Sequence, residues 1–183
     1  LAMIYVVGTP IASIMKGLTD FLTGMSGANA ILLGIILGAM MCFDLGGPVN
    51  KVAYVSGTGL LASNPNVPSL PMAAVMAGGM VPPIAIALST TLFKNKFTKE
   101  EKDAGLSNYV MGLSFITEGA IPYAASDPTR VIPANIVGSA IAGALTMLFG
   151  IKIPAPHGGI LVMFLSNNFV MYFLKGHAFI PIN

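Results

Sequence analysis

A single acidic residue, Glu118, lies within an apolar stretch that runs from Gly105 to Ser126. A carboxylate at membrane depth is costly unless it is paired, hydrated or protonated, so such acids usually mark a functional site. Thr117, Gly119 and Pro122 flank it, interrupt a regular helix and leave backbone polar groups free for a ligand. Glu118 is therefore our candidate to bind a hydroxylated ligand and accept a proton. The alternative is a protonated structural carboxyl bonded to a neighbouring helix.

Asn50 and Lys51 form a second polar pair in an apolar neighbourhood, directly after the sequence Gly-Gly-Pro-Val at 46–49. Asn can donate to and accept from hydroxyl groups, and Lys offers a positive charge to a phosphoryl group. The nearby glycines indicate a lined cavity and favour a binding role. The alternative is a structural ion pair between Lys51 and Asp44.

His157 is the third candidate, and it lies between two prolines and two glycines in the sequence Pro-Ala-Pro-His-Gly-Gly at 154–159. Prolines restrict the chain and glycines allow close approach, so a ligand contact and a helix-capping histidine are equally good interpretations. His177 is distant in sequence, and neither histidine has a nearby acidic partner, so no metal site is expected. Nucleotide-binding and hydrolase motifs are absent, and no cofactor is expected.

Composition places these residues in a membrane. The chain is 55% hydrophobic and 9% charged, with a mean hydropathy of +0.81, whereas soluble domains carry about a quarter charged residues. The net charge of +2 is too small to indicate nucleic-acid binding. Cys42 is the only cysteine, which excludes an intrachain disulfide, and its apolar neighbours predict a buried, inert thiol.

The apolar runs at 67–93 and 131–150 are long enough to span a bilayer as helices. Pro82 and Pro83 are expected to kink or split the first of them. The run at 28–43 would span only if its ends snorkel or the bilayer thins, and Gly34 and Gly38 give it a GxxxG pattern. The lysine-rich segment 94–103 is predicted to be a cytoplasmic loop in which a capping box at 98–101 opens a short helix.

Two segments, Asp44–Asn66 and Gly105–Pro128, are rich in glycine, proline and polar residues. We expect each to form a re-entrant hairpin or broken helix, and such paired interruptions indicate the binding site of a transporter. The chain is therefore predicted to be an all-α, multi-pass integral membrane protein. Because Leu1 lies in an apolar run without a charged leader, we expect the chain to be part of a longer polypeptide.

Four segments carry a family resemblance when they are taken together and in order: DLGGPVNKVAY at 44–54, GLSFITEGAIP at 112–122, Asp127-Pro128, and PAPHGG at 154–159. The chain resembles, over essentially its whole length, the fructose-type membrane component IIC of the bacterial phosphoenolpyruvate-dependent sugar phosphotransferase system. The resemblance implies that a sugar is carried inward and phosphorylated by a phosphocysteine of a cytoplasmic IIB domain, which IIA supplies. It also implies an elevator-type transport domain with two re-entrant hairpins at 28–183, preceded by a connecting amphipathic or transmembrane helix at 1–27.

The resemblance also implies roles for single residues. The Thr117-Glu118 pair matches the sugar-binding acid of the family, Lys51 occupies the place nearest to a histidine of related members, and His157 belongs to a fructose-type motif. Glu118 would be catalytic, and the substrate-binding residues would be Asn50, Lys51, Thr117, Glu118 and His157. Cys42 lacks the surroundings of a phosphocysteine, and the IIA and IIB phosphorylation sites are absent, so the chain alone would be inactive.

The function expected from the resemblance is that of a lipid-embedded permease for a hexose, fructose in the first instance, which is a homodimer at full length in a bacterial cell membrane. Two other classes of function remain open at this point. One is an ion- or proton-coupled secondary transporter in which Glu118 is the coupling carboxyl. The other is a structural membrane scaffold.

Overall fold

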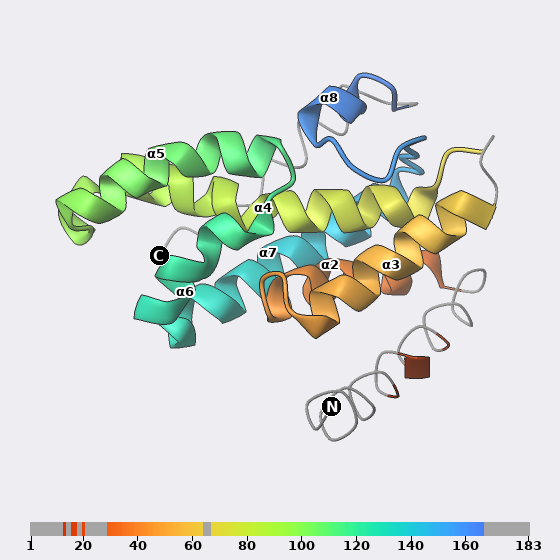
Figure 1. Ribbon diagram of the computed structural model, residues 1–183, viewed down its shortest axis with the longest axis horizontal. Helices are drawn as coiled ribbons and strands as arrows, with labels where there is room; N and C mark the ends of the chain where they lie inside the picture. Colours follow the sequence, from red (N-terminus) through yellow and green to blue (C-terminus); the bar gives the residue numbers. More distant parts are fainter. Residues whose placement is uncertain (1–12, 14–15, 18–19, 21–28, 64–66, 167–183) are drawn as a thin grey trace, which may run out of the picture.

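The computed structural model describes residues 13, 16–17, 20, 29–63 and 67–166. The predicted connecting helix at 1–27 falls almost wholly outside the described residues, as does His177. The described part consists of helices joined by turns and loops, with one isolated bridge between Ser69 and Ile153 (Figure 1). Its elements, in order, are α2 (Ala30–Phe43), α3 (Pro48–Ser63), α4 (Leu70–Leu92), η2 (Lys94–Lys96), α5 (Lys99–Leu113), η3 (Thr117–Ala120), α6 (Ile121–Ser126), α7 (Pro128–Leu148) and α8 (Ile160–Met163).

Helix α4 is the central element, and α2, α3, α5 and α7 all pack against it (Figure 1). It begins after Ser69, whose hydroxyl accepts a hydrogen bond from the Met72 backbone N–H and so caps the helix. Helices α4 and α7 are long and apolar enough to cross a membrane. We expected Pro82 and Pro83 to kink or split this helix, and the structure shows that they do not split it. Neighbouring side chains donate hydrogen bonds to the carbonyls that the prolines leave free, so the helix can continue.

Helices α2 and α7 cross at very close range. A methyl group at Gly38 would overlap the carbonyl of Ser139, and one at Gly34 would overlap that of Gly143. The GxxxG pattern of the sequence is therefore the packing face of α2. Cys42 follows on the same face with 0% exposure, and its Sγ lies 2.7 Å from the Ser139 Oγ, which confirms the predicted buried thiol.

The chain reverses direction within Gly105–Pro128, as its composition predicted. Helix α5 ends at Leu113, the chain turns, and η3 with α6 runs back until the Tyr123 hydroxyl donates to the Glu101 carbonyl near the start of α5. The predicted capping box is present at the start of α5, where Thr98 and Glu101 bond each other's backbone. This segment is therefore a helical hairpin in which α6 packs against η3 and α7.

The segment Asp44–Asn66 differs from its prediction. The reversal is confined to Asp44–Gly47, and Pro48–Ser63 follows as one continuous helix, so the hairpin consists of α2 and α3. Glycine inside a helix costs only about 1 kcal/mol, which packing can offset. Gly57 turns its open side to Met72 and Val75 of α4, and this close approach supports the uninterrupted helix.

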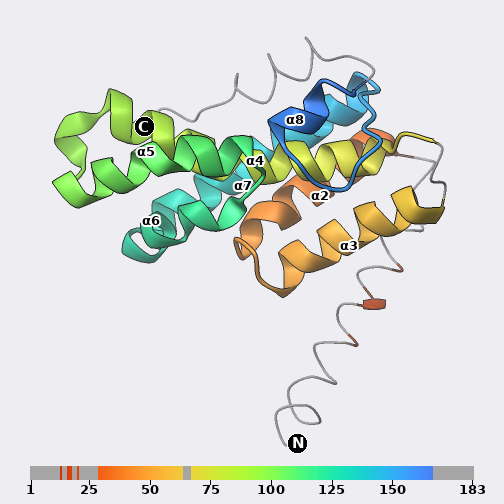
Figure 2. The same ribbon diagram turned by 45° about the horizontal axis from the view of Figure 1, so that its top comes forward.

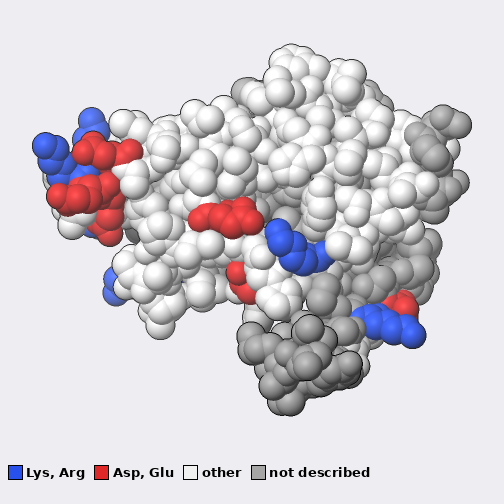
Figure 3. Space-filling view, in the orientation of Figure 1, with Lys and Arg blue, Asp and Glu red and all other residues white. Residues whose placement is uncertain are grey.

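The two hairpins lie along opposite halves of α4, with α5 and α6 beside one half and α2 and α3 beside the other (Figures 1 and 2). Their turns consequently face each other near the middle of α4. Most of the charged side chains on the face shown in Figure 3 gather at one end of the molecule, the end formed by η2 and the start of α5. The middle of this face carries only a few charged side chains on an otherwise uncharged surface.

Candidate functional site

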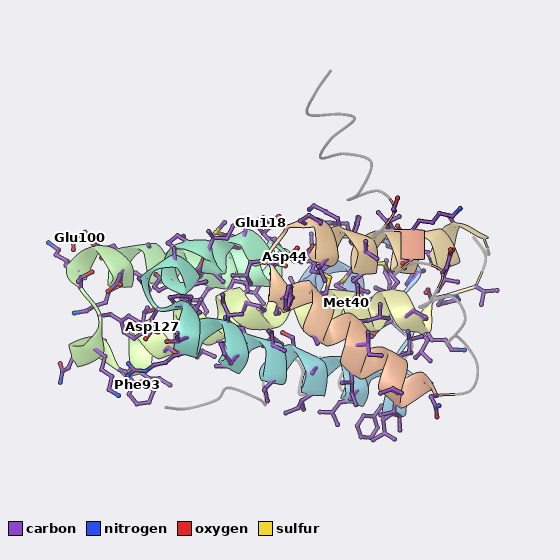
Figure 4. All side chains as sticks on the ribbon, turned by 90° about the horizontal axis from the view of Figure 1, so that it is seen from below. Met40, Asp44, Phe93, Glu100, Glu118 and Asp127 are labelled. Carbon is purple, nitrogen blue, oxygen red and sulfur yellow. The ribbon has the colours of Figure 1, made fainter. Side chains whose placement is uncertain are left out.

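The site is formed where the tips of the two hairpins meet. Thr117, at the second tip, donates its hydroxyl hydrogen to the Gly79 carbonyl over 3.0 Å, which fixes this tip at the middle of α4. Glu118 follows and lies against the first tip, so that a methyl group added to Gly46 would be 2.8 Å from its Oε1. Figure 4 shows Glu118 and Asp44 close together, well away from Glu100 and Asp127. Two acids distant in sequence thus share one site.

Lys51 is the partner of Glu118, with its Nζ 3.7 Å from Oε1. The side chains of Lys51 and Glu118 are 55% and 46% exposed. An exposed pair of this kind contributes only about 0–1 kcal/mol, so a ligand could separate it at little cost. Figure 3 shows acidic and basic groups side by side on an otherwise uncharged part of the surface. The tips therefore present one carboxylate and one ammonium group to an open space.

Asp44 does not pair with Lys51, so the structural ion pair considered from the sequence is not observed. Its two carboxylate oxygens accept hydrogen bonds from the backbone N–H groups of Val49 (2.7 Å) and Asn50 (2.9 Å). These are N–H groups at the start of α3, where a helix has no internal acceptors and where a negative charge is stabilising. Asp44 is thus the group that shapes the first tip, and it leaves Lys51 free to reach Glu118.

Asn50 and Thr117 are both buried, with 4% of their surface exposed. The Asn50 Nδ2 donates to the Met41 carbonyl over 2.6 Å and ties the start of α3 to the end of α2. Thr117 holds the second tip to α4 in the same way. In this structure both side chains are buried beneath the tips and hydrogen-bond to the neighbouring helices, whereas Lys51 and Glu118 lie on the exposed side.

His157 belongs to a small aromatic cluster whose other members lie close in sequence to Lys51 and Glu118. Its ring centroid is 5.2 Å from that of Phe115 and 6.4 Å from that of Tyr54, which lies one helical turn beyond Lys51. His157 is exposed, and it does not cap α8, because Gly159 is the N-cap residue and no side chain bonds the helix start. A methyl group at Gly159 would overlap the Leu113 carbonyl, so the glycines allow the loop to lie against the second tip.

Backbone strain marks both tips. Leu45 (φ 45°) and Phe115 (φ 63°) adopt left-handed backbone conformations that residues other than glycine rarely take. Both side chains are buried, and this burial holds them in place. Strain of this kind concentrates at binding sites.

Tyr54 and Phe115, whose rings lie 6.2 Å apart, carry no distinguishing signal in the sequence, since each is an aromatic residue in an apolar segment. Of the residues that the sequence singled out, Lys51 and Glu118 lie 3.7 Å apart, and His157 packs against Phe115, which precedes Glu118 in the second tip. Among the described residues there is no group of three His, Cys, Asp or Glu side chains that could hold a metal ion.

Comparisons with known proteins point in one direction. The family model described as "Phosphotransferase system, EIIC" matches residues 1–138. The chain is 60% identical over 167 residues to the fructose-specific EIIB'BC component of the phosphotransferase system of Vibrio cholerae, and this match covers 91% of the chain and 28% of that protein. It is 49% identical over 173 residues to the fructose permease IIC component of Bacillus amyloliquefaciens, which covers 94% of the chain and 56% of the relative.

A third relative is the fructose-specific EIIC component of Haloferax volcanii, which is 54% identical over 171 residues, covering 93% of the chain and 45% of that protein. The chain therefore spans between 28% and 56% of the length of these three relatives. No solved structure matches the chain.

Proposed function

The chain belongs to the EIIC family of the phosphotransferase system, and from this membership we propose that it forms the sugar-binding part of a fructose permease whose substrate is phosphorylated during uptake. The relatives are named as fructose-specific components, several of them fused to B or A and B components. These names support a phosphotransferase permease over the ion- or proton-coupled transporter considered above. The single structural observation that carries the proposal is the Lys51–Glu118 pair at the meeting point of the two hairpin tips.

The position of that pair suits a transport site. If α4 crosses the bilayer, Gly79 and the tip bound to it lie near the midplane, where transporters hold their substrates between discontinuous helices. In this proposal the α2–α3 and α5–α6 hairpins are re-entrant and approach from opposite membrane surfaces. Residues 28–183 then make up an elevator-type transport domain of a multi-pass bacterial membrane protein that is a homodimer at full length.

Each site residue then has a role. The Glu118 carboxylate accepts hydrogen bonds from sugar hydroxyls, as an ionised carboxylate with several acceptor positions can. Lys51 turns from the carboxylate towards the incoming phosphoryl group. Tyr54 and His157 contact the apolar face of the sugar, and the buried Phe115 packs against both rings and holds them in place. Asn50 keeps the first tip in place by its bond to Met41.

The chemical step needs a partner, because the phosphoryl group comes from a IIB phosphocysteine. A sugar hydroxyl oxygen attacks phosphorus, the O–P bond forms, the S–P bond breaks and the cysteine leaves as a thiolate. The hydroxyl proton passes to Glu118, which is exposed enough to reach it. The chain therefore supplies sugar binding and a base, while IIA and IIB supply the phosphoryl group.

The test is Glu118→Gln in the intact permease, assayed in membrane vesicles with phosphoenolpyruvate and its phosphocarrier proteins. Gln keeps the size and most hydrogen bonds but cannot take the proton, so phosphorylation of fructose should fall by about 10²–10⁴-fold while fructose binding persists. Glu100→Gln, an exposed acid at the far end of the molecule, is the matched control and should retain full activity. Wild-type turnover by Glu118→Gln would remove Glu118 from the mechanism. Vesicles of the wild-type protein that form no fructose phosphate would overturn the proposed function.

A further inference from the structure

The middle of α4 has an unusual backbone. Pro82 and Pro83 lack an N–H group, so the carbonyls of Gly78 and Gly79, four residues earlier, receive no hydrogen bond from within the helix. All four residues are buried. A buried carbonyl without a partner is strongly unfavourable, above all in an apolar surrounding. The double proline therefore creates two acceptors that other elements must satisfy.

Each freed carbonyl is bonded by a side chain from another element. The Ser139 Oγ of α7 donates to the Gly78 carbonyl over 2.8 Å, and the Cys42 Sγ of α2 lies 3.6 Å from the same oxygen. The Thr117 Oγ1 of η3 donates to the Gly79 carbonyl over 3.0 Å. The carbonyl freed by Pro82 thus bonds side chains of α2 and α7 where these helices cross. The carbonyl freed by Pro83 bonds the tip that carries Glu118.

Side chains from both hairpin tips lie directly against the backbone of Gly79. A methyl group there would overlap the Phe115 ring and lie 2.8 Å from the Met41 Cε and 3.0 Å from the Thr117 Oγ1. Both hairpin tips therefore rest on this one residue, Met41 from the first and Phe115 with Thr117 from the second. Thr117 immediately precedes Glu118, so anchoring one residue restricts where the other can lie.

We propose that Pro83 and Thr117 are positioning residues, because the Gly79 carbonyl that Pro83 frees holds the Thr117 hydroxyl and thereby fixes Glu118 opposite Lys51. In this assignment Thr117 acts on the sugar through Glu118 rather than by touching it, in keeping with its burial. The catalytic consequence rests on the proposed function, whereas the anchoring itself does not.

The anchoring is tested by a thermal unfolding cycle on the intact protein. Thr117→Val removes the donor but keeps the shape, and the orphaned carbonyl should lower the unfolding temperature by about 2–4 °C. Pro83→Ala supplies a backbone N–H to the same carbonyl, so the double variant should recover most of that loss. Thr117→Ser should behave as wild type. Pro82→Ala is the matched control, since its backbone N–H would bond the Gly78 carbonyl instead and should not rescue Thr117→Val. If Thr117→Val lowered the unfolding temperature equally in the wild-type and Pro83→Ala backgrounds, the proposed anchoring would be overturned.

The positioning is tested by fructose phosphorylation with the same variants. Displacing a reacting group by about 1 Å costs on the order of 10²-fold in rate, and Thr117→Val should lower kcat by that order. The double variant Pro83→Ala/Thr117→Val should regain stability but not rate, because the tip stays detached. Thr117→Val should add no further loss to Glu118→Gln, since both act on one group.

Two results would overturn the positioning role. Recovery of rate together with stability in the double variant would make Thr117 merely structural, and multiplying losses with Glu118→Gln would place Thr117 on the sugar itself. A wild-type protein that phosphorylates no sugar would overturn the proposed function, and the unfolding cycle would still decide whether Pro83 and Thr117 anchor the tip.

Discussion

At the scale of single residues, the Lys51–Glu118 pair is placed by backbone shape more than by its own attraction. An exposed pair gains only about 0–1 kcal/mol, too little to define a site. Gly46 has a φ of 110° and no side chain, so the first tip can lie directly under the Glu118 carboxylate. Only glycine adopts this backbone conformation freely. Gly46 is therefore as important to the site as either charge.

Gly46→Ala should reduce both stability and sugar binding. Forcing a side chain into this conformation costs about 1–3 kcal/mol, and its methyl group would press on the Glu118 carboxylate. Gly59→Ala is the control, because Gly59 lies in α3 with nothing within 4 Å of an added methyl group. Thermal unfolding and fructose binding would be measured for both variants. A Gly46→Ala protein that matches Gly59→Ala in both would show that the close approach is unimportant.

Lys51→Gln should separate function from stability. Since the pair is exposed, losing it should cost at most about 1 kcal/mol of unfolding free energy. Loss of the positive charge should nevertheless slow phosphoryl transfer, which can be measured as fructose phosphate formed with the phosphocarrier partners. Lys96→Gln, at the distant charged end, should change neither quantity. A large fall in stability with unchanged turnover would contradict a role in the reaction.

The sequence identified charged residues more readily than the residues that hold them. Glu118 and Lys51 stand out because a charge in an apolar segment is costly. Asn50 and Thr117 stood out as well, but the direction in which each side chain points depends on the carbonyls of Met41 and Gly79. These acceptors are close in the fold but lie 9 and 38 residues away in the sequence. Local patterns reveal the presence of polar groups, whereas their orientation is decided by tertiary contacts.

At the scale of elements, small residues decide how closely helices approach. Glycine and proline composition correctly indicated a chain reversal in Gly105–Pro128, yet similar composition in Asp44–Asn66 left Pro48–Ser63 as one helix. The difference lies in packing, because Gly57 meets α4 through Met72 and Val75. Glycine thus accompanies the end of a helix in one segment and allows close helix packing in another.

Gly38→Ala should weaken the α2–α7 crossing. Its methyl group would overlap the Ser139 carbonyl, and a backbone group cannot move aside without separating the helices, so we expect a loss of about 1–3 kcal/mol. Ile35→Val changes the exposed side of the same helix and should have little effect. Thermal unfolding of the two variants provides the comparison. Equal unfolding temperatures would mean that the crossing tolerates separation.

At the scale of the whole molecule, the tip-to-tip arrangement places the site far from both ends of α4. The segment after α7 returns to the start of α4, where the Ser69 N–H donates to the Ile153 carbonyl over 2.8 Å. The lysine-rich segment that contains η2 follows the other end of α4. In the proposed permease, a substrate at Glu118 would therefore lie roughly midway between the two ends of α4.

This arrangement predicts which side of the membrane each end faces. Helix α4 has 23 residues, or about 34 Å at 1.5 Å per residue, against a hydrocarbon core of about 30 Å. Lysine-rich segments remain in the cytoplasm, so a cysteine at Asn95 should react only with a reagent on the cytoplasmic side. A cysteine at Lys152, next to Ile153 at the opposite end, should react only from outside. The native Cys42 has 0% exposure and should give little background. Labelling of both positions from the same side in intact cells and inverted vesicles would mean that α4 does not cross the membrane, and the midplane position of Glu118 would have to be abandoned.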